Sequence, residues 1–188
     1  MSAPQRMVVG ISGASGVIYG VRLLEILRDL GIESHLVISA AAEITLAHET
    51  SLKLAQVQAL ASQVHAAGDI AAGIASGSFR TMGMIVAPCS VRSMSEIASG
   101  VTSGLLTRAA DVTLKEQRKL VLMVRETPLH RGHLRTMAQL AEMGAIIAPP
   151  VPAFYTRPTT LEQIIDHSLG RILDLFGIDA QVVNRWKD

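Results

Sequence analysis

The chain has 188 residues and a formal net charge of +1, with 49% hydrophobic but only 3% aromatic residues. This length favours one domain, and the near-neutral charge gives no electrostatic support for a nucleic-acid or anionic-membrane partner. The single cysteine, Cys89, excludes an internal disulfide and fits a cytoplasmic protein. Apolar runs are too short for a membrane span. The mean hydropathy of +0.36 indicates apolar surface buried between copies, hence a homo-oligomer.

Apolar runs of strand length alternate with segments whose apolar residues recur at helical spacing. After a loose arm at residues 1–6, the first half is expected to form a strand at Met7–Ile11, a helix at Val17–Leu30, a strand at Glu33–Ile38, a helix at Ala40–Glu49 and a short helical piece at Leu54–Ala61. The second half is expected to form a loop-rich connection at Gln63–Arg80, a strand at Met82–Ala87, a polar turn at Ser90–Ser93, a helix at Leu105–Lys115, a strand at Leu120–Val124, a helix at His133–Met143, a strand at Ala145–Ala148, a helix at about Leu161–Phe176 and a tail at 177–188.

This alternation predicts an α/β fold, with a parallel sheet covered by helices on both faces. Right-handed crossovers bring the carboxyl ends of all strands to one edge, where ligands of such sheets bind. Four polar clusters follow predicted strands, namely Ser12–Ser15, Ser39, Ser90–Ser93 and Arg125-Glu126. We therefore expect a single site at this edge, in one domain that spans residues 1–188.

The first polar cluster is rich in glycine, with Gly10, Gly13 and Gly16 interleaved with Ser12 and Ser15. Glycine permits a sharp turn, and the helix N-terminus that follows favours negative charge, so this corner is predicted to hold a phosphate. Its G-x-x-G-x-x-G spacing matches neither the dinucleotide fingerprint nor the Walker pattern, so it indicates neither NAD nor ATP. A plain glycine turn between a strand and a helix is the alternative interpretation.

Five segments in a fixed order carry a resemblance to a known family: Gly10–Gly20, Pro88–Ser90, Arg108–Glu116, Arg125–Leu129 and Pro152–Tyr155. From about Met7 to Trp186 the chain resembles the UbiX-type flavin prenyltransferases, within the wider flavoprotein fold. The resemblance implies a Rossmann- or flavodoxin-like three-layer α/β/α domain with a mostly parallel sheet. It also implies a homo-oligomer, typically a dodecamer.

The activity that the resemblance implies joins two substrates. Reduced FMN would receive a dimethylallyl group from dimethylallyl monophosphate at N5, with ring closure at C6 and without a metal. The product, prenylated FMN, would serve UbiD-type decarboxylases in ubiquinone biosynthesis or aromatic-acid decarboxylation. Two alternatives stay open: an FMN-dependent decarboxylase of cysteine derivatives, and a non-catalytic flavin-carrier subunit of an aromatic-acid decarboxylase.

Roles for single residues also follow from the resemblance. Flavin contacts are implied for Gly13, Ala14, Ser15, Ser39, Ser90, Val91, Arg92, Ser93 and Arg125. Contacts with the prenyl phosphate are implied for Lys115, Arg125, Tyr155, Arg171 and Trp186. Catalytic roles are implied for Ser15, Glu49, Lys115 and Glu126.

These residue types suit the implied chemistry, because breaking an allylic C–O bond requires donors and cations around the departing phosphate. The proton lost at C6 must go to a carboxylate or to the released phosphate, and both options stay open. Without the resemblance, Lys115 reads as a solvated helix residue and Trp186 as an anchor of the tail against a neighbouring subunit. The pair His130 and His133 lacks an obvious third ligand, so no metal site is expected.

Overall fold

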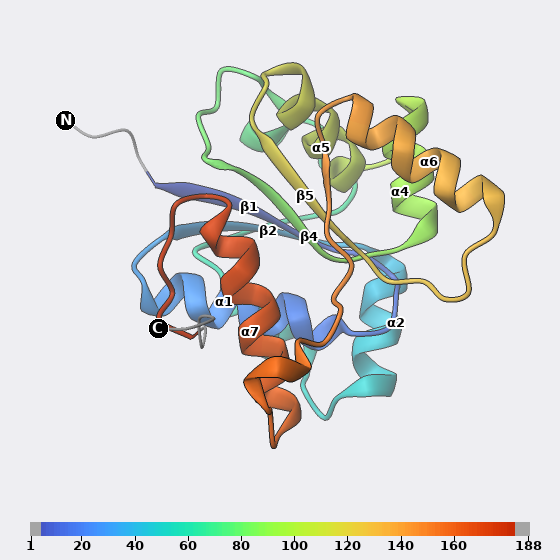
Figure 1. Cartoon of the computed structure of the whole chain (residues 1–188). Helices are drawn as coiled ribbons and strands as arrows, with labels where there is room; N and C mark the ends of the chain where they lie inside the picture. The colour runs from blue at the N-terminus through green and yellow to red at the C-terminus, as the bar shows by residue number, and fades with distance from the viewer. Residues whose placement is uncertain (1–4, 183–188) are drawn as a thin grey trace.

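The computed structural model describes residues 5–182. At its centre is a parallel sheet whose strands lie in the order β3-β2-β1-β4-β5-β6 (Figure 1). The strands are β1 Arg6–Ile11, β2 Glu33–Ile38, β3 Gln63–His65, β4 Gly83–Cys89, β5 Lys119–Val124 and β6 Ile146–Ile147. This is the order of a doubly wound sheet whose direction of winding reverses between β1 and β4. The predicted α/β fold is confirmed.

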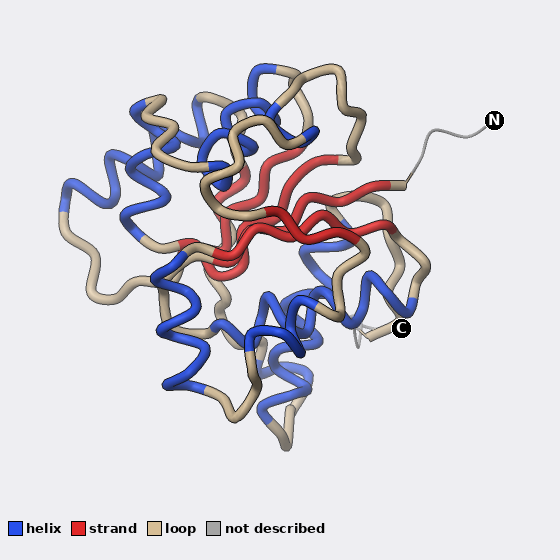
Figure 2. Tube along the Cα trace, turned by 180° about the vertical axis from the view of Figure 1, so that it is seen from behind, coloured by secondary structure: helices blue, strands red, loops and turns tan. Residues whose placement is uncertain are grey.

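Helices cover both faces of the sheet, which gives three layers (Figure 2). One layer contains α1 Val17–Asp29, α2 Ala40–Glu49, α3 Leu54–Gln58 and α7 Leu161–Asp174. The other contains α4 Val91–Ser99, α5 Leu105–Lys115, α6 Arg131–Glu142 and the 3-10 turn η1 Gly73–Ala75. A second 3-10 turn, η2 Phe154–Thr156, precedes α7.

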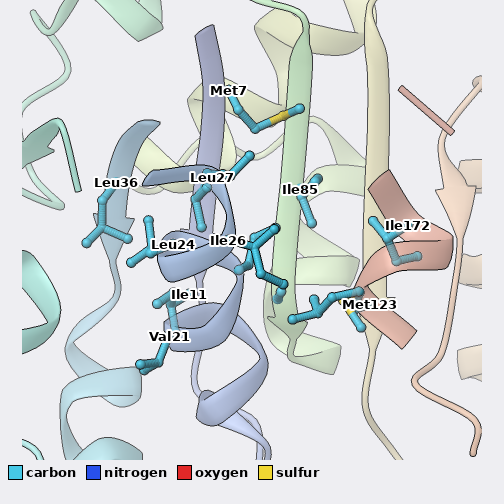
Figure 3. Close-up of a cluster of buried hydrophobic side chains, with 14 of the residues drawn as sticks. Met7, Ile11, Val21, Leu24, Ile26, Leu27, Leu36, Ile85, Met123 and Ile172 are labelled. Carbon is cyan, nitrogen blue, oxygen red and sulfur yellow. The ribbon is translucent and has the colours of Figure 1, made fainter. Parts of the chain in front are cut away.

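The strands are apolar on both faces because each face packs against helices. In β1, Met7, Val9 and Ile11 pack against α1, whereas Val8 belongs to the cluster on the opposite face. Figure 3 shows the first cluster, which is aliphatic throughout its labelled residues. Burying each such side chain contributes roughly 1.5–3 kcal/mol, so the two clusters supply most of the stability of the sheet.

The structure differs from the predicted elements at three places. Strand β3 lies in the segment expected to be a loop-rich connection; it has three residues, and Gln63 and Val64 are exposed, so it leaves little signal. The expected polar turn at Ser90–Ser93 is the start of α4, with Ser90 as its N-cap. Strand β1 begins at Arg6, so that residue does not belong to the predicted loose arm.

None of the helices within residues 5–182 combines the length and the apolar character that a membrane crossing requires.

Gly20 allows α1 to approach the sheet closely. A Cβ atom at this position would lie 2.4 Å from the carbonyl oxygen of Ala87 and 2.7 Å from the side chain of Ile11. Both distances are shorter than any real Cβ contact, and the carbonyl belongs to the backbone of β4. Helix α1 can therefore lie this close to β4 only because residue 20 has no side chain.

We expect Gly20→Ala to lower the free energy of unfolding by roughly 1–3 kcal/mol, because α1 must move away from β4. In a helix without this contact, replacing glycine by alanine would raise the free energy of unfolding by up to about 1 kcal/mol. A decrease would therefore show that α1 packs closely against β4 at Gly20. Urea unfolding followed by circular dichroism measures the difference. Arg28→Ala, on the exposed side of the same helix, is the control and should stay within about 0.5 kcal/mol. Unchanged or increased stability of Gly20→Ala would contradict this packing.

Candidate active site

Hydrogen bonds bring the four predicted polar clusters together at the carboxyl edge of the sheet. The buried Ser12 hydroxyl donates to the carbonyl of Pro88 at 2.9 Å and accepts from the backbone N–H of Ser90 at 2.7 Å. The N–H of Ser39 donates to the last residue of β1 at 3.0 Å, and the N–H of Arg125 donates to the last residue of β4 at 3.1 Å. The expectation that these clusters share one edge is confirmed.

A cavity of about 370 Å³ opens between the N-termini of α2 and α4, and we call it the α2/α4 cavity. Five of the residues predicted to contact flavin line it: Gly13, Ser39, Ser90, Arg92 and Ser93. Val91 is the first residue of α4, and the N–H of Ala14 closes the turn by donating to Ser12 at 2.8 Å. The cavity wall also includes the Ala67-Gly68 loop after β3 and Ser103 before α5, which sequence reasoning missed.

The two helix N-termini make the α2/α4 cavity suitable for an anionic group. Ser39 caps α2 by accepting from the N–H of Ala42 at 3.2 Å, and Ser90 caps α4 by accepting from the N–H of Ser93 at 3.2 Å. Both helix dipoles favour negative charge at these ends. A Cβ on Gly13 would lie 2.4 Å from the Cβ of Ala41, so only glycine lets the first loop lie this close to α2.

Glu96 binds Arg92, which lines this cavity. Its carboxylate accepts from the Ser103 hydroxyl at 2.6 Å and from Nε of Arg92 at 2.9 Å. The bond from Ser103 is the main cause that lowers the pKa of Glu96, and Arg92 lowers it further against the opposing effect of burial. The carboxylate is therefore ionised and neutralised by Arg92. This pair was absent from the sequence prediction, because no helix was expected between the polar turn at Ser90–Ser93 and Leu105.

A second cavity, of about 610 Å³, lies between α1 and α7, and we call it the α1/α7 cavity. Ser15 and Tyr19 line it on one side, and Arg125 and Glu126 line it after β5. The remaining wall is largely apolar and comes from residues 149–151, Leu161 and Ile165. Ser15 thus borders the second cavity from the same loop through which Gly13 borders the first.

Tyr19 was part of the motif that carried the family resemblance but had no predicted role. It is half-buried, and burial raises the pKa of its hydroxyl, although a hydrogen bond with Ser168 and the charge of Arg125 oppose this effect. Tyr19 is therefore a neutral phenol beside a cation. Next to it, Arg22 forms a bidentate ion pair with Asp166, at 2.7 Å and 3.2 Å, which joins α1 to α7.

Glu49 reaches from the end of α2 to the start of α1. Its Oε2 accepts from the N–H of Gly16 at 2.8 Å and from that of Val17 at 3.1 Å. Burial alone would raise the pKa of Glu49, but the hydrogen bonds from Ser15, Gly16 and Val17 and the charge of Arg125 together lower it. The sequence predicted that a bound phosphate would use the N-terminus of α1. That expectation is corrected, because the carboxylate of Glu49 already accepts from these donors.

Glu126 is exposed at the mouth of the α1/α7 cavity, where its carboxylate accepts from the N–H of Thr127 at 3.0 Å. Both predicted catalytic carboxylates, Glu49 and Glu126, therefore lie near Ser15 and Arg125. The structure brings these four predicted residues together from three separate segments.

Within a single chain, Lys115 and Arg171 lie far along their helices from the residues that line the two cavities. Leu106, in the first turn of α5, lines the α2/α4 cavity. Lys115 is nine residues further along this helix, about 14 Å away along the helix axis. Arg171 is ten residues beyond Leu161 of the α1/α7 cavity, about 15 Å along α7. Lys115 donates to Glu116, and Arg171 donates to Asp174 at 2.8 Å. The prediction that both share a pocket with Arg125 is therefore not met within one chain.

Tyr155 lies in η2, half-exposed, with its hydroxyl 3.3 Å from Nε2 of His167 on α7. Arg171 is one turn further along the same helix, and its charge acts on His167. Two residues predicted to meet the prenyl phosphate are thus neighbours through a histidine that sequence reasoning missed. Trp186 lies outside the described residues.

Among residues 5–182, no three side chains of His, Cys, Asp or Glu gather as a metal site would require. The ring of His130 instead caps α6, because its Nδ1 accepts from the N–H of Gly132 at 3.0 Å and of His133 at 3.4 Å. Cys89 is fully buried, and burial raises the pKa of its thiol to about 12, so it packs as a protonated side chain.

Comparison with known proteins agrees with this geometry. Residues 1–185 match the Flavoprotein family. The chain is 61% identical over 186 residues to the flavin prenyltransferase UbiX of Escherichia coli (strain K12), which covers 97% of this chain and 98% of the relative. The chain belongs to the UbiX-type flavin prenyltransferases of the flavoprotein family.

Solved structures of UbiX-type proteins share the whole fold. The AnUbiX (PadA1) protein, crystallised in complex with FMN and dimethylallyl pyrophosphate, superposes with a TM-score of 0.97 at 48% identity over 99% of both chains. A dodecameric FMN-dependent UbiX-like decarboxylase from Escherichia coli O157:H7 superposes with a TM-score of 0.95 at 46% identity, over 98% of this chain and 100% of that one. The predicted family is confirmed, and the roles of single residues stay predictions.

The lowered pKa of Glu49 yields a test of its contact with α1 in this UbiX-type chain. Because the pKa in the folded state lies below its ordinary value of 4.5, the ionised group stabilises the fold above that value. This stabilisation is lost as the pH falls through the lowered pKa. Glu49→Gln should lower the free energy of unfolding by about 0.5 kcal/mol at pH 7, a small amount because the site is exposed to solvent.

Urea unfolding of the wild type and Glu49→Gln at a series of pH values measures this difference, which should shrink once the pH is below the lowered pKa. Glu43→Gln, in the first turn of the same helix, is the control and should not reproduce the pH dependence. A difference that persists unchanged in acid would show that the carboxylate of Glu49 does not act on α1 through its charge.

Proposed function

We propose that the protein transfers a dimethylallyl group from a dimethylallyl phosphate to reduced FMN. Reduced FMN supplies the nucleophilic N5 and the neighbouring C6. The C–O bond of the donor breaks and phosphate leaves with the bonding electrons, while a C–N bond forms at N5 and the proton of N5 passes to the departing phosphate. Ring closure at C6 then releases one proton, and the alkene of the transferred group takes one up, so the flavin product gains one prenyl unit.

The observation that carries this proposal is the position of the first loop between two cavities. Gly13 borders the α2/α4 cavity and Ser15 borders the α1/α7 cavity, only two residues apart. Two ligands that react with one another can therefore bind on the two sides of one loop. A flavin carrier would require only one of these cavities.

FMN fits the α2/α4 cavity. Its phosphate would meet the capped N-termini of α2 and α4, together with the hydroxyls of Ser39 and Ser90. The missing side chain of Gly13 lets the first loop lie against α2, so that the loop forms part of the cavity wall. Arg92, tied to Glu96, closes the rim. The side chains that line this cavity would thus hold an anionic cofactor without a cluster of lysines.

The donor suits the α1/α7 cavity. Its apolar wall accommodates the dimethylallyl group, and Arg125 and the neutral Tyr19 offer cationic and hydroxyl contacts for an oxyanion. Glu49 is ionised and next to Ser15, which makes it our candidate for the group that accepts the proton from C6. Glu126 would orient Arg125 at the opposite side of the cavity.

Lys115 and Arg171 enter this proposal through neighbouring copies of the chain. Both are exposed side chains at the far ends of their helices, so another protomer can bring them to the donor site. A dodecameric UbiX-like relative supports an assembly of this kind. We propose a cytoplasmic homo-oligomer, in which each site is completed by an adjacent subunit and the product passes to a UbiD-type decarboxylase.

The first experiment identifies the product. Purified protein, reduced FMN and dimethylallyl monophosphate, incubated anaerobically with a metal chelator, should give a flavin heavier by one prenyl group in mass spectrometry. Dimethylallyl pyrophosphate is tested in parallel, because the charge of the bound phosphate decides which donor fits. Oxidised FMN is the control and should give no adduct, since its N5 is not nucleophilic.

The alternatives predict other results, one of them in a parallel incubation with a peptide substrate and oxidised FMN. A decarboxylase of cysteine derivatives would release CO₂ from a peptide with a C-terminal cysteine and would reduce oxidised FMN. A flavin carrier would bind FMN and leave its mass unchanged. Either result, with no prenyl adduct from either donor, would contradict the proposed transfer.

The second experiment tests whether Lys115 acts from a neighbouring subunit. Lys115→Met and Glu49→Ala should each retain FMN binding and lose most transfer activity. Co-expressed as mixed oligomers, they should recover about a quarter of the wild-type rate, because about one site in four then combines the intact Glu49 of one variant with the intact Lys115 of the other.

Glu49→Ala mixed with Glu126→Ala is the matched control, since both carboxylates lie in the same chain's site. This mixture should recover no activity, because every site retains one defect. Recovery in the control, or no recovery with Lys115→Met, would contradict the proposed division of the site between subunits.

A further inference from the structure

His167 on α7 is a buried imidazole next to a predicted donor-binding tyrosine. Only 8% of the residue is exposed, and its Nε2 lies 3.3 Å from the hydroxyl oxygen of Tyr155. The two rings meet edge to face, with centroids 5.6 Å apart and an interplanar angle of 83°. Within the described part of the chain, Nδ1 of His167 is buried without a hydrogen-bond partner.

This unpartnered nitrogen discriminates between the two neutral tautomers. If the proton were on Nδ1, a buried N–H would lack an acceptor, which is rarer in proteins than an under-satisfied acceptor. With the proton on Nε2, Nδ1 is only an unused acceptor, and the N–H points to Tyr155. The neutral tautomer with the proton on Nε2 is therefore the favoured form.

The surroundings of His167 keep it neutral. Burial is the main cause that lowers its pKa, and the positive charge of Arg171 one turn away lowers it further, against the opposing effect of Asp174. A neutral imidazole has one donor and one acceptor, so its tautomer decides what the tyrosine hydroxyl does. A charged imidazole would have an additional N–H without an acceptor.

We propose that His167 is a positioning residue that donates from Nε2 to the oxygen of Tyr155 and so directs the hydroxyl hydrogen of Tyr155 toward an anionic oxygen of the donor phosphate. This inference rests on the proposed function and on the family resemblance, which implies that Tyr155 contacts the prenyl phosphate. The opposite tautomer would accept the hydroxyl hydrogen and present oxygen lone pairs to the phosphate, which would repel it. His167 thus makes Tyr155 a donor to the phosphate.

Steady-state kinetics of three variants test this role. His167→Met removes the N–H and should raise the KM for dimethylallyl monophosphate about five- to tenfold, with a smaller change in kcat. His167→Gln retains a donor and should stay within about threefold of the wild type. In a Tyr155→Phe background, His167→Met should have almost no further effect, because the hydroxyl that it positions is gone.

His133→Met is the matched control. His133 is the other described histidine with a buried, unpartnered Nδ1, and it stacks on His130 rather than on a tyrosine. This variant should leave the KM for the donor unchanged. An equal increase in KM for His167→Met with and without Tyr155, or a His167→Gln variant as impaired as His167→Met, would overturn the proposal.

A measurement without turnover separates this inference from the proposed function. Magic-angle-spinning NMR of 15N-histidine-labelled wild type, with His167→Gln used to assign the signal, should show His167 protonated at Nε2 and unprotonated at Nδ1. The opposite tautomer, or an imidazolium at pH 7, would overturn the inference even if prenylated FMN forms. Absence of prenylated FMN with the expected tautomer would instead contradict the proposed function.

Discussion

The site depends on the buried hydroxyl of Ser12, which joins the ends of two strands. It donates to the carbonyl of Pro88 and accepts from the N–H of Ser90, at the point where the strand order of the sheet reverses. A buried hydroxyl with both bonds made stabilises the structure modestly, but either backbone group left alone would cost about 1–3 kcal/mol. This small side chain therefore positions the loop of Gly13 and Ser15 against α4, and both cavities follow from that position.

Helices α1, α2 and α4 begin at this edge of the sheet, and the structure uses their N-termini differently. The donors of α1 are taken by Glu49, which belongs to the same chain, whereas α2 and α4 begin at the wall of a cavity. A carboxylate at the start of α1 repels a second anion there and leaves the α2/α4 cavity as the better position for a phosphate. The same carboxylate then becomes available, in ionised form, beside Ser15.

Local sequence predicted those features that depend on neighbours along the chain. The strands, the cap at Ser39 and the gathering of polar loops all follow from periodicity and from the handedness of crossovers. Features that depend on distant pairs were missed: the bonds of Glu49 to α1 and the contact of Tyr155 with His167. The separation of Glu49 from Gly16 in the sequence does not reveal that the last residue of α2 will contact the N-terminus of α1.

The positions of Lys115 and Arg171 follow from the topology of the sheet. Helix α5 leads into the parallel strand β5, so its last turn lies at the amino edge of the sheet, opposite the carboxyl edge where the loops gather. Helix α7 ends near the same edge, because Lys119 at the start of β5 donates to the carbonyl of Leu175 just after α7. A sequence motif can assign a function to Lys115 and Arg171, but it does not show that the fold of one chain keeps them away from the carboxyl edge. The high mean hydropathy and the exposed apolar residues Val151 and Phe154 indicate how the gap is closed, because both favour burial against another copy. In the proposed function the assembly is then a part of the active site, because neighbouring chains would supply the cations that the fold of one chain directs to the opposite edge.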